Sequence, residues 1–186
     1  MTTPNLSGKR VAFLVANIGV EQVELTSPWK AVKSAGGTAV LIAPKKERVQ
    51  GMNGATEKAD TFDPDLAVTE ASADEFAALV LPGGVANPDK LRTEPAAVAL
   101  VKSFAQAGKP IAAICHGPWT LVEADVVRGK TLTSWPSLQT DIRNAGGTWR
   151  DEQVVTSSEG GYPLVTSRKP DDLDAFNGAL LNALAT

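Results

Sequence analysis

The sequence predicts an α/β protein built on one open, doubly wound, mostly parallel sheet sandwiched between helices. Two observations lead to this fold class. Short, nearly continuous apolar runs, which are typical of strands buried on both faces, alternate along the chain with amphipathic segments at helical spacing. No repeat, low-complexity tract or linker interrupts this alternation, and a length of 186 residues favours a single domain, residues 1–186.

The first strand is predicted at residues 10–16, where the chain reads Arg-Val-Ala-Phe-Leu-Val-Ala. A loop follows at 17–20, and apolar residues at helical spacing then predict a helix at 21–35, which a Gly-Gly pair ends. A second apolar strand at 38–43 completes a strand–helix–strand unit, the building block of parallel sheets.

The remaining elements continue the alternation. The polar stretch 45–64 contains a small hairpin around Asn53-Gly54, and 65–75 is at most weakly helical. Further strands are expected at 76–81, 110–114, 128–133, 148–150, 154–157 and 164–167. Further helices are expected at 95–107, 118–124, 136–145 and 170–184.

Composition excludes several functional classes. The net charge is −3, which argues against nucleic-acid binding through phosphate neutralisation. The start of the chain, 1–8, is polar and no segment reaches the length of a membrane helix, so we expect a cytoplasmic protein with no membrane partner. One cysteine and one histidine leave no disulfide and no Cys/His metal site, and no Gly-x-Gly-x-x-Gly follows the first strand, so neither a metal nor a cofactor is expected.

The stretch 109–119 is the most informative part of the chain. It reads Lys-Pro-Ile-Ala-Ala-Ile-Cys-His-Gly-Pro-Trp and holds both Cys115 and His116. Gly117 permits a sharp turn, and Pro118 is favoured at the first position of a helix. We therefore expect Cys115 on a tight strand-to-helix elbow, where the helix N-terminus lowers the thiol pKa and favours the reactive thiolate. The alternative is a small core residue, because free cysteine is commonly buried.

Ligands of parallel sheets bind at the carboxyl ends of the strands, so the loops after three strands are expected to meet near Cys115. His116 is a candidate base, or a cation that favours the thiolate, and Asp89 is a candidate to orient it. Gly83 and Gly84, with the His116 backbone, are candidate oxyanion donors. Glu21 is expected to share one proton with the sulfur. Each has a plainer interpretation, since glycines mark turns and acids favour helix starts.

Four segments resemble the PfpI family, within the ThiJ/PfpI superfamily that also includes class I glutamine amidotransferases. They are Ala113-Ile114-Cys115-His116-Gly117-Pro118, Leu79-Val80-Leu81-Pro82-Gly83-Gly84, Glu21-Gln22-Val23-Glu24-Leu25 and Thr166-Ser167-Arg168-Lys169-Pro170-Asp171-Asp172-Leu173. The resemblance implies a flavodoxin-like fold and a Cys115 nucleophile with Glu21 hydrogen-bonded to its sulfur. It also implies a homodimer or larger ring, in which Asp89 falls where the family places an acid that orients His116 across a subunit interface.

Three functions are left open. By the resemblance, the first is a stress-response cysteine hydrolase, either a peptidase or a deglycase, acting on damaged proteins, peptides or small dicarbonyls. The second is a non-enzymatic oxidative-stress sensor or chaperone in which Cys115 is oxidised. The third, a cofactor-binding module, is weak because the chain lacks a phosphate-binding glycine motif.

Overall fold

The computed structural model describes residues 4–185 and contains a seven-stranded sheet with strand order β11-β12-β8-β7-β1-β3-β6. Its neighbouring strands run parallel except β11, which pairs antiparallel with β12. The doubly wound, mostly parallel sheet predicted from the sequence is therefore confirmed. The strands are β1 (Arg10–Leu14), β3 (Thr38–Ala43), β6 (Leu66–Ala67), β7 (Ala78–Leu81), β8 (Ile111–Ile114), β11 (Val154–Ser157) and β12 (Leu164–Ser167).

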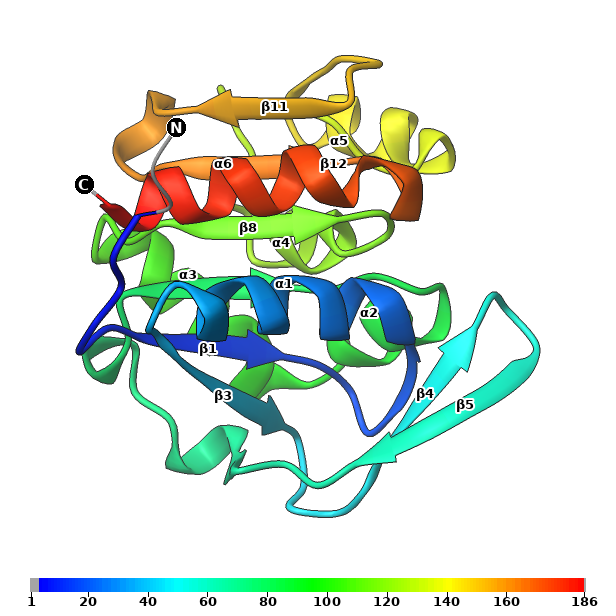
Figure 1. The fold of residues 1–186 in the computed structure, drawn as a ribbon. Coiled ribbons are helices and arrows are strands. Elements are labelled where there is room, and N and C mark those ends of the chain that lie inside the picture. Colours follow the sequence, from blue (N-terminus) through cyan, green and yellow to red (C-terminus); the bar gives the residue numbers. More distant parts are fainter. Residues whose placement is uncertain (1–3, 186) are drawn as a thin grey trace.

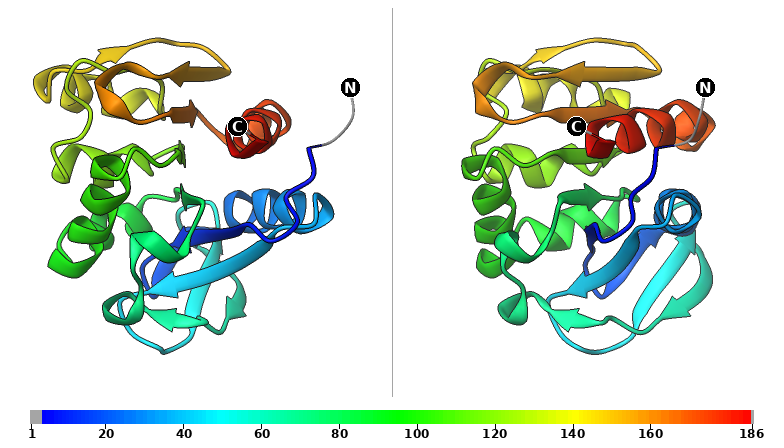
Figure 2. Two further views of the ribbon diagram at one scale, coloured as in Figure 1. Left: turned by 90° about the vertical axis from the view of Figure 1, so that its left-hand side faces the viewer. Right: turned by 60° about the vertical axis from the view of Figure 1, so that its left-hand side comes forward.

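Helices cover both faces of this sheet (Figures 1 and 2). One face packs against α1 (Gln22–Ser34) and α6 (Leu173–Ala185) through residues such as Val32 and Phe176. The other face packs against α3 (Pro95–Gln106) and α4 (Pro118–Glu123) through residues such as Phe104 and Leu121. The remaining helices are α2 (Ala86–Leu91) and α5 (Gln139–Asn144), with short 3-10 turns η1 (Val68–Glu70), η2 (Ala73–Glu75), η3 (Pro136–Leu138), η4 (Glu159–Gly161) and η5 (Pro170–Asp172).

The burial of β1 on both faces explains why its sequence does not alternate between apolar and polar residues. Val11 and Phe13 belong to the core under α1 and α6, whereas Ala12 and Leu14 belong to the core on the opposite face. Successive side chains of a strand point to opposite faces, so a strand covered on both sides needs apolar residues throughout. The same reasoning applies to β7 and β8, whose residues are all buried.

The chain also forms two small sheets, whose strand pairing was not predicted, although the hairpin at Asn53-Gly54 and strands within 128–133 and 148–150 were. The loop predicted at 17–20 contains most of β2 (Ile18–Glu21), which pairs with β4 (Val49–Asn53), and β4 pairs in turn with β5 (Glu57–Phe62). The hairpin around Asn53-Gly54 is confirmed. Strand β2, which pairs with the first strand of this hairpin, was missed because β4 is distant from it in sequence. A second pair joins β9 (Thr131–Leu132) to β10 (Thr148–Trp149).

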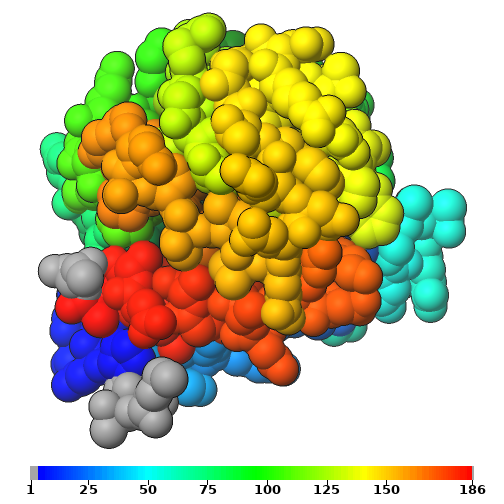
Figure 3. Space-filling view, turned by 90° about the horizontal axis from the view of Figure 1, so that it is seen from above, coloured from blue at the N-terminus to red at the C-terminus, as the bar shows by residue number. Residues whose placement is uncertain are grey.

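The β4–β5 hairpin projects from the side where the parallel strands end (Figure 1), and it protrudes at one edge of the molecule when seen from above (Figure 3). No helix within residues 4–185 is long and apolar enough to cross a membrane. The polar segment 1–8 is only partly described, since residues 1–3 lie outside the described range.

Buried Asn87 ties the carboxyl ends of two central strands together. Its Nδ2 donates to the carbonyls of Pro82 and Gly83, each at 2.9 Å, and its Oδ1 accepts the N–H of Ala16 at 2.6 Å. Asn87 is fully buried, so water cannot replace these bonds.

We expect Asn87→Ala to lower the free energy of unfolding by roughly 2–4 kcal/mol, because several buried backbone groups lose their partner at once. Chemical denaturation measures the loss. Lys90→Ala, an exposed change on the same helix, is the control and is expected to stay within about 0.5 kcal/mol of the parent chain. Similar losses for both variants would contradict the role assigned to Asn87.

Candidate active site

Cys115 lies on the predicted strand-to-helix turn. Strand β8 ends at Ile114, and Pro118 is the first residue of α4. Cys115 has a φ of 61°, a left-handed conformation that is uncommon for a residue with a side chain. Gly117 is required two residues later, because a Cβ there would lie 2.5 Å from the carbonyl oxygen of Leu81. The elbow predicted from the sequence is therefore confirmed.

The acid beside the sulfur is Glu24, which corrects the prediction of Glu21. Glu24 is fully buried in the first turn of α1, and its Oε2 accepts the N–H of Gly83 at 2.8 Å. Its carboxyl group interacts with the thiol of Cys115. Glu21 instead accepts the N–H of Gly54 with Oε2 at 2.8 Å, at the tip of the β4–β5 hairpin.

The helical register explains this difference. Glu24, Pro28 and Val32 share the buried stripe of α1 at four-residue spacing, whereas Glu21 precedes the helix as its N-cap residue. An acidic residue on an otherwise apolar stripe was the signal that could have identified Glu24. Gly83 completes the contact, since a Cβ at that position would lie 2.6 Å from Glu24 Oε2 and 2.7 Å from Cys115 Cβ.

Burial controls the protonation of this pair. It raises the pKa of Glu24 to about 8, against hydrogen bonds that favour the carboxylate. Burial and the neighbouring Glu24 carboxylate also raise the pKa of the Cys115 thiol, so the predicted lowering of its pKa is wrong for this geometry. Two negative charges in contact in a buried site are unfavourable, so the pair releases its first proton only near pH 8 and the second at higher pH. The single shared proton expected for Glu21 and the sulfur therefore describes Glu24 and Cys115 once that first proton has left.

His116 contacts the sulfur despite being the next residue. The distance between Cys115 Sγ and His116 Nδ1 is 3.2 Å. The imidazole lies against the ring of Trp119 and stacks on that of Trp135. Burial lowers its pKa to about 4, so the ring is neutral at pH 7. The interpretation of His116 as a cation is wrong, whereas a neutral imidazole is able to accept a proton.

The candidate oxyanion donors divide into two groups. The N–H of Gly83 is already used by Glu24, so this residue supports the carboxyl rather than a substrate oxygen. The backbone N–H groups of Gly84 and His116 face the sulfur and lower the pKa of Cys115. Gly84 has a φ of 81°, and a Cβ there would lie 2.3 Å from the carbonyl oxygen of Gly19, so glycine is needed at this position.

Cys115 lies in the wall of a cavity of about 340 Å³, although its own exposed fraction is only 6%. The indole of Trp135, 39% exposed, contributes an apolar wall, and the hairpin tip at Gly54 and Ala55 forms another. The lining residues are Glu21, Glu24, Gly54, Ala55, Gly84, Val85, Cys115, His116, Trp135 and Pro170.

Asp89 is not part of this cavity. It lies on the exposed side of α2, whereas its buried neighbour Asn87 supports the Pro82-Gly83 turn. Within one chain Asp89 therefore does not orient His116, and a role toward a second copy stays a prediction. Within the described part of the chain, no cluster of three His, Cys, Asp or Glu side chains is placed to hold a metal ion.

A comparison with models of known protein families identifies the family of this chain. The model described as the DJ-1/PfpI family matches residues 9–183. The chain belongs to the DJ-1/PfpI family. The resemblance inferred from the four sequence segments is confirmed, and the family match covers the elbow, the Gly83-Gly84 turn and the acidic segment at the start of α1.

Two curated members of the DJ-1/PfpI family align over almost the whole chain. "Putative cysteine protease YraA" of Bacillus subtilis and "Protein/nucleic acid deglycase 2" of Escherichia coli are each 40% identical over 177 residues, 95% of this chain and 98% of theirs. Among solved structures, a two-domain protein of Anabaena variabilis with DJ-1/ThiJ/PfpI-like and ferritin-like domains matches with a TM-score of 0.86 and 38% identity, covering 95% of this chain and 48% of that one.

The protonation of Glu24 has a measurable effect on stability. Because its pKa rises from the usual 4.5 to about 8 on folding, the folded chain keeps a proton that the unfolded chain releases above about pH 4.5. The stabilising contribution is complete below that pH and is lost as the pH rises through about 8, with a slope of at most about 1.4 kcal/mol per pH unit.

We expect Glu24→Gln to flatten the fall in unfolding free energy between about pH 5 and pH 8, since an amide does not titrate. Denaturation curves at several pH values measure the slope, and Glu21→Gln is the control because it changes a carboxylate at the cavity rim. An unchanged slope in Glu24→Gln would show that another group causes the pH dependence.

Proposed function

We propose that this chain is a cysteine-dependent hydrolase of the stress response, a deglycase or peptidase, in which Cys115 attacks an electrophilic carbonyl carbon. The observation that carries the proposal is the contact of a cavity-lining thiol with a neutral imidazole, His116, which is able to accept its proton, and with the carboxyl group of Glu24. A thiol becomes a strong nucleophile when an adjacent base takes its proton.

The chemistry follows from the positions of these groups. The thiol proton passes to His116 Nδ1, which lies 3.2 Å from the sulfur, or, above about pH 8, to the ionised Glu24 carboxylate. The sulfur then forms a bond to the carbonyl carbon, and the carbonyl oxygen gains negative charge. The N–H groups of Gly84 and His116, which face the sulfur, are the donors available to that oxygen.

The intermediate is resolved by returning the proton. In an amide or glycation adduct, the carbon–nitrogen bond breaks when the protonated acid or imidazole delivers its proton to the departing amine. For an amide, the acyl group left on sulfur is then released by water, which restores the thiol. For a glycation hemiaminal, loss of the amine leaves a hemithioacetal, and protons must shift from its carbinol carbon and hydroxyl to the neighbouring carbonyl group to form a thioester before water releases the acid. Both reaction types use the same three side chains, so the size of the substrate distinguishes a deglycase from a peptidase.

Cavity size favours small carbonyl groups. About 340 Å³ is near the lower end for small-molecule sites and suits a dicarbonyl or one modified side chain. The names of two relatives, one a putative cysteine protease and the other a deglycase, support a cysteine hydrolase without favouring either reaction type. Because of the cavity size, we place glycated side chains and small dicarbonyls ahead of peptide bonds as substrates.

Assembly and location are part of the same proposal. We infer a homodimer or larger ring from the family resemblance, and the exposed position of Asp89 on α2 leaves its carboxylate available to a second copy. We infer a cytoplasmic location because the single cysteine is free within the described chain and reduced thiols persist in that compartment.

Turnover measurements test the activity. In amine-free buffer, the parent chain is expected to consume methylglyoxal adducts of amines or thiols, and Cys115→Ser is expected to abolish turnover because serine is not activated in this site. Glu24→Gln should lower kcat/KM by about 10²-fold or more, whereas Glu21→Gln should lower it by less than about tenfold. A model peptide assayed in parallel separates the two reaction types.

Equal rates for the parent chain and Cys115→Ser, with near-ultraviolet circular dichroism showing that both are folded, would end the proposal. Equal losses in Glu24→Gln and Glu21→Gln would keep Cys115 as nucleophile but remove the specific role of Glu24.

A redox sensor is the second candidate, supported by the same buried carboxyl. A protonated Glu24 beside the sulfur is able to donate a hydrogen bond to a sulfinate, which stabilises that oxidation state. Intact mass after mild peroxide treatment is expected to show two added oxygen atoms on the parent chain and none on Cys115→Ser. An unchanged mass under conditions that oxidise a free thiol would count against this function.

A further inference from the structure

The backbone of Cys115 is held in its left-handed conformation by two other segments. Its N–H donates to the carbonyl of Ser167 at 3.0 Å, and its carbonyl accepts the N–H of Trp135 at 2.8 Å. A left-handed conformation is unfavourable for a residue with a Cβ, so it persists only where the surroundings enforce it. The two bonds fix the direction in which the sulfur points.

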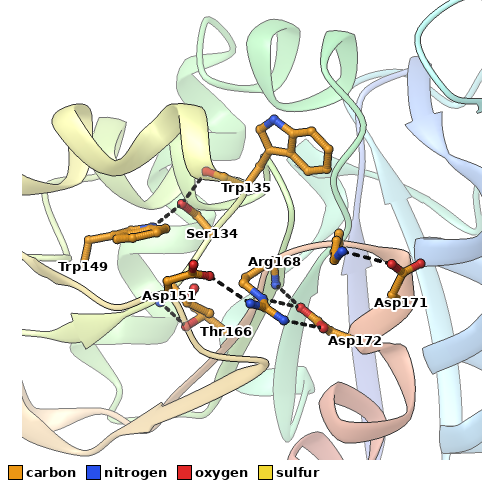
Figure 4. Close-up of polar contacts among 10 residues, drawn as sticks. Ser134, Trp135, Trp149, Asp151, Thr166, Arg168, Asp171 and Asp172 are labelled. Carbon is orange, nitrogen blue, oxygen red and sulfur yellow. Dashed lines mark hydrogen bonds and ion pairs between the residues drawn. The ribbon is translucent and has the colours of Figure 1, made fainter.

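An ion-pair network fixes the segment around Ser167, whose carbonyl accepts the N–H of Cys115 (Figure 4). Arg168, next to Ser167, donates from Nε and Nη2 to the buried carboxylate of Asp172 at 2.9 and 3.0 Å. Its Nη1 donates to Asp151 at 2.8 Å. A bidentate guanidinium–carboxylate pair restricts orientation more strongly than a single contact. Pro170, two residues further on, lines the cavity.

A second network of hydrogen bonds fixes the segment around Trp135, whose N–H donates to the carbonyl of Cys115. Trp149 Nε1 donates to Ser134 Oγ at 3.0 Å, and Ser134 Oγ donates to the carbonyl of Trp135 at 2.8 Å. Figure 4 shows Trp149, Ser134 and Trp135 in this order. Trp135 is the residue whose N–H reaches Cys115 and whose ring stacks on His116.

Both networks end on one short segment outside the cavity. Trp149 and Asp151 lie two residues apart where β10 ends, and neither lines the cavity around Cys115. We propose that residues 149–151 form a clamp that positions the Cys115 nucleophile, with Trp149 acting through Ser134 and Asp151 acting through Arg168. Trp149 and Asp151 are positioning residues. The inference depends on one part of the proposed function, the role of Cys115 as nucleophile.

Loosening the clamp has a defined consequence. If the Cys115 backbone relaxes, the sulfur turns away from the N–H groups of Gly84 and His116, which favour its charged form, while it stays buried beside Glu24, and both burial and Glu24 disfavour that form. The thiol then ionises at higher pH and reacts more slowly at a fixed pH. A residue that only contributed stability would leave this pH profile unchanged.

The test uses alkylation of Cys115 by iodoacetamide, followed by intact mass between pH 6 and pH 10. Trp149→Phe keeps a ring but loses the N–H donor, and Asp151→Asn removes one charge from Arg168. Each is expected to slow alkylation at pH 7.5 by about 3- to 10-fold and to move the profile to higher pH, and the double variant to slow it by about 10- to 100-fold. Asp151→Glu, which retains the charge, is expected to restore most of the rate.

Glu75→Gln is the matched control, because it breaks the Arg10–Glu75 ion pair at the opposite end of the sheet and should leave the profile unchanged. If Trp149→Phe does not fold, Ser134→Ala interrupts the same network. Parent-like profiles in folded Trp149→Phe (or Ser134→Ala) and Asp151→Asn would overturn the proposal, as would a lower Tm without a change in profile. Iodoacetamide is not a substrate, so this result is independent of whether the chain hydrolyses anything.

Discussion

The site depends on the burial of one carboxyl group against one thiol. Glu24 is fully buried, and the first-turn position that puts it beside Cys115 also removes it from water. Burial keeps both groups protonated near neutral pH, so two potential anions are able to lie in contact without charge repulsion. The surrounding backbone is adapted to this contact. Gly83 leaves room for the carboxyl and donates to it, and Asn87 holds Gly83 and the end of β1 in place.

The sheet supplies the geometry that brings these parts together. β1, β7 and β8 are adjacent and parallel, so the chain segments that follow them emerge at one edge. One leads into β2 and α1 with Glu24, the second makes the Gly83-Gly84 turn, and the third is the Cys115 elbow. Each contributes a different group: an acid, close backbone donors and a thiol on a left-handed backbone. Their combination requires the parallel order of the strands, because antiparallel neighbours would send successive loops to opposite edges.

Local patterns predicted most of the fold and half of the site. The apolar runs of β1, β3, β7 and β8 are visible in sequence because both faces of these strands are buried. Cys115 and Gly84 were identified from the turn residues around them. Glu24 was missed because the choice between it and Glu21 depends on where α1 begins, and a shift of one turn exchanges the buried position for the rim. The strand β2 and the network from Trp149 to Trp135 depend on contacts between segments distant along the chain, which no local pattern reports.

The β4–β5 hairpin gives the cavity a wall that is independent of the central sheet. Its tip, Gly54 and Ala55, faces Cys115, and its attachment near the cavity is the contact between Glu21 and the Gly54 N–H. Length and side chains at a hairpin tip can change during evolution without disturbing a buried core. Substitutions at the hairpin tip are thereby able to reshape the cavity without touching the buried pair of Cys115 and Glu24.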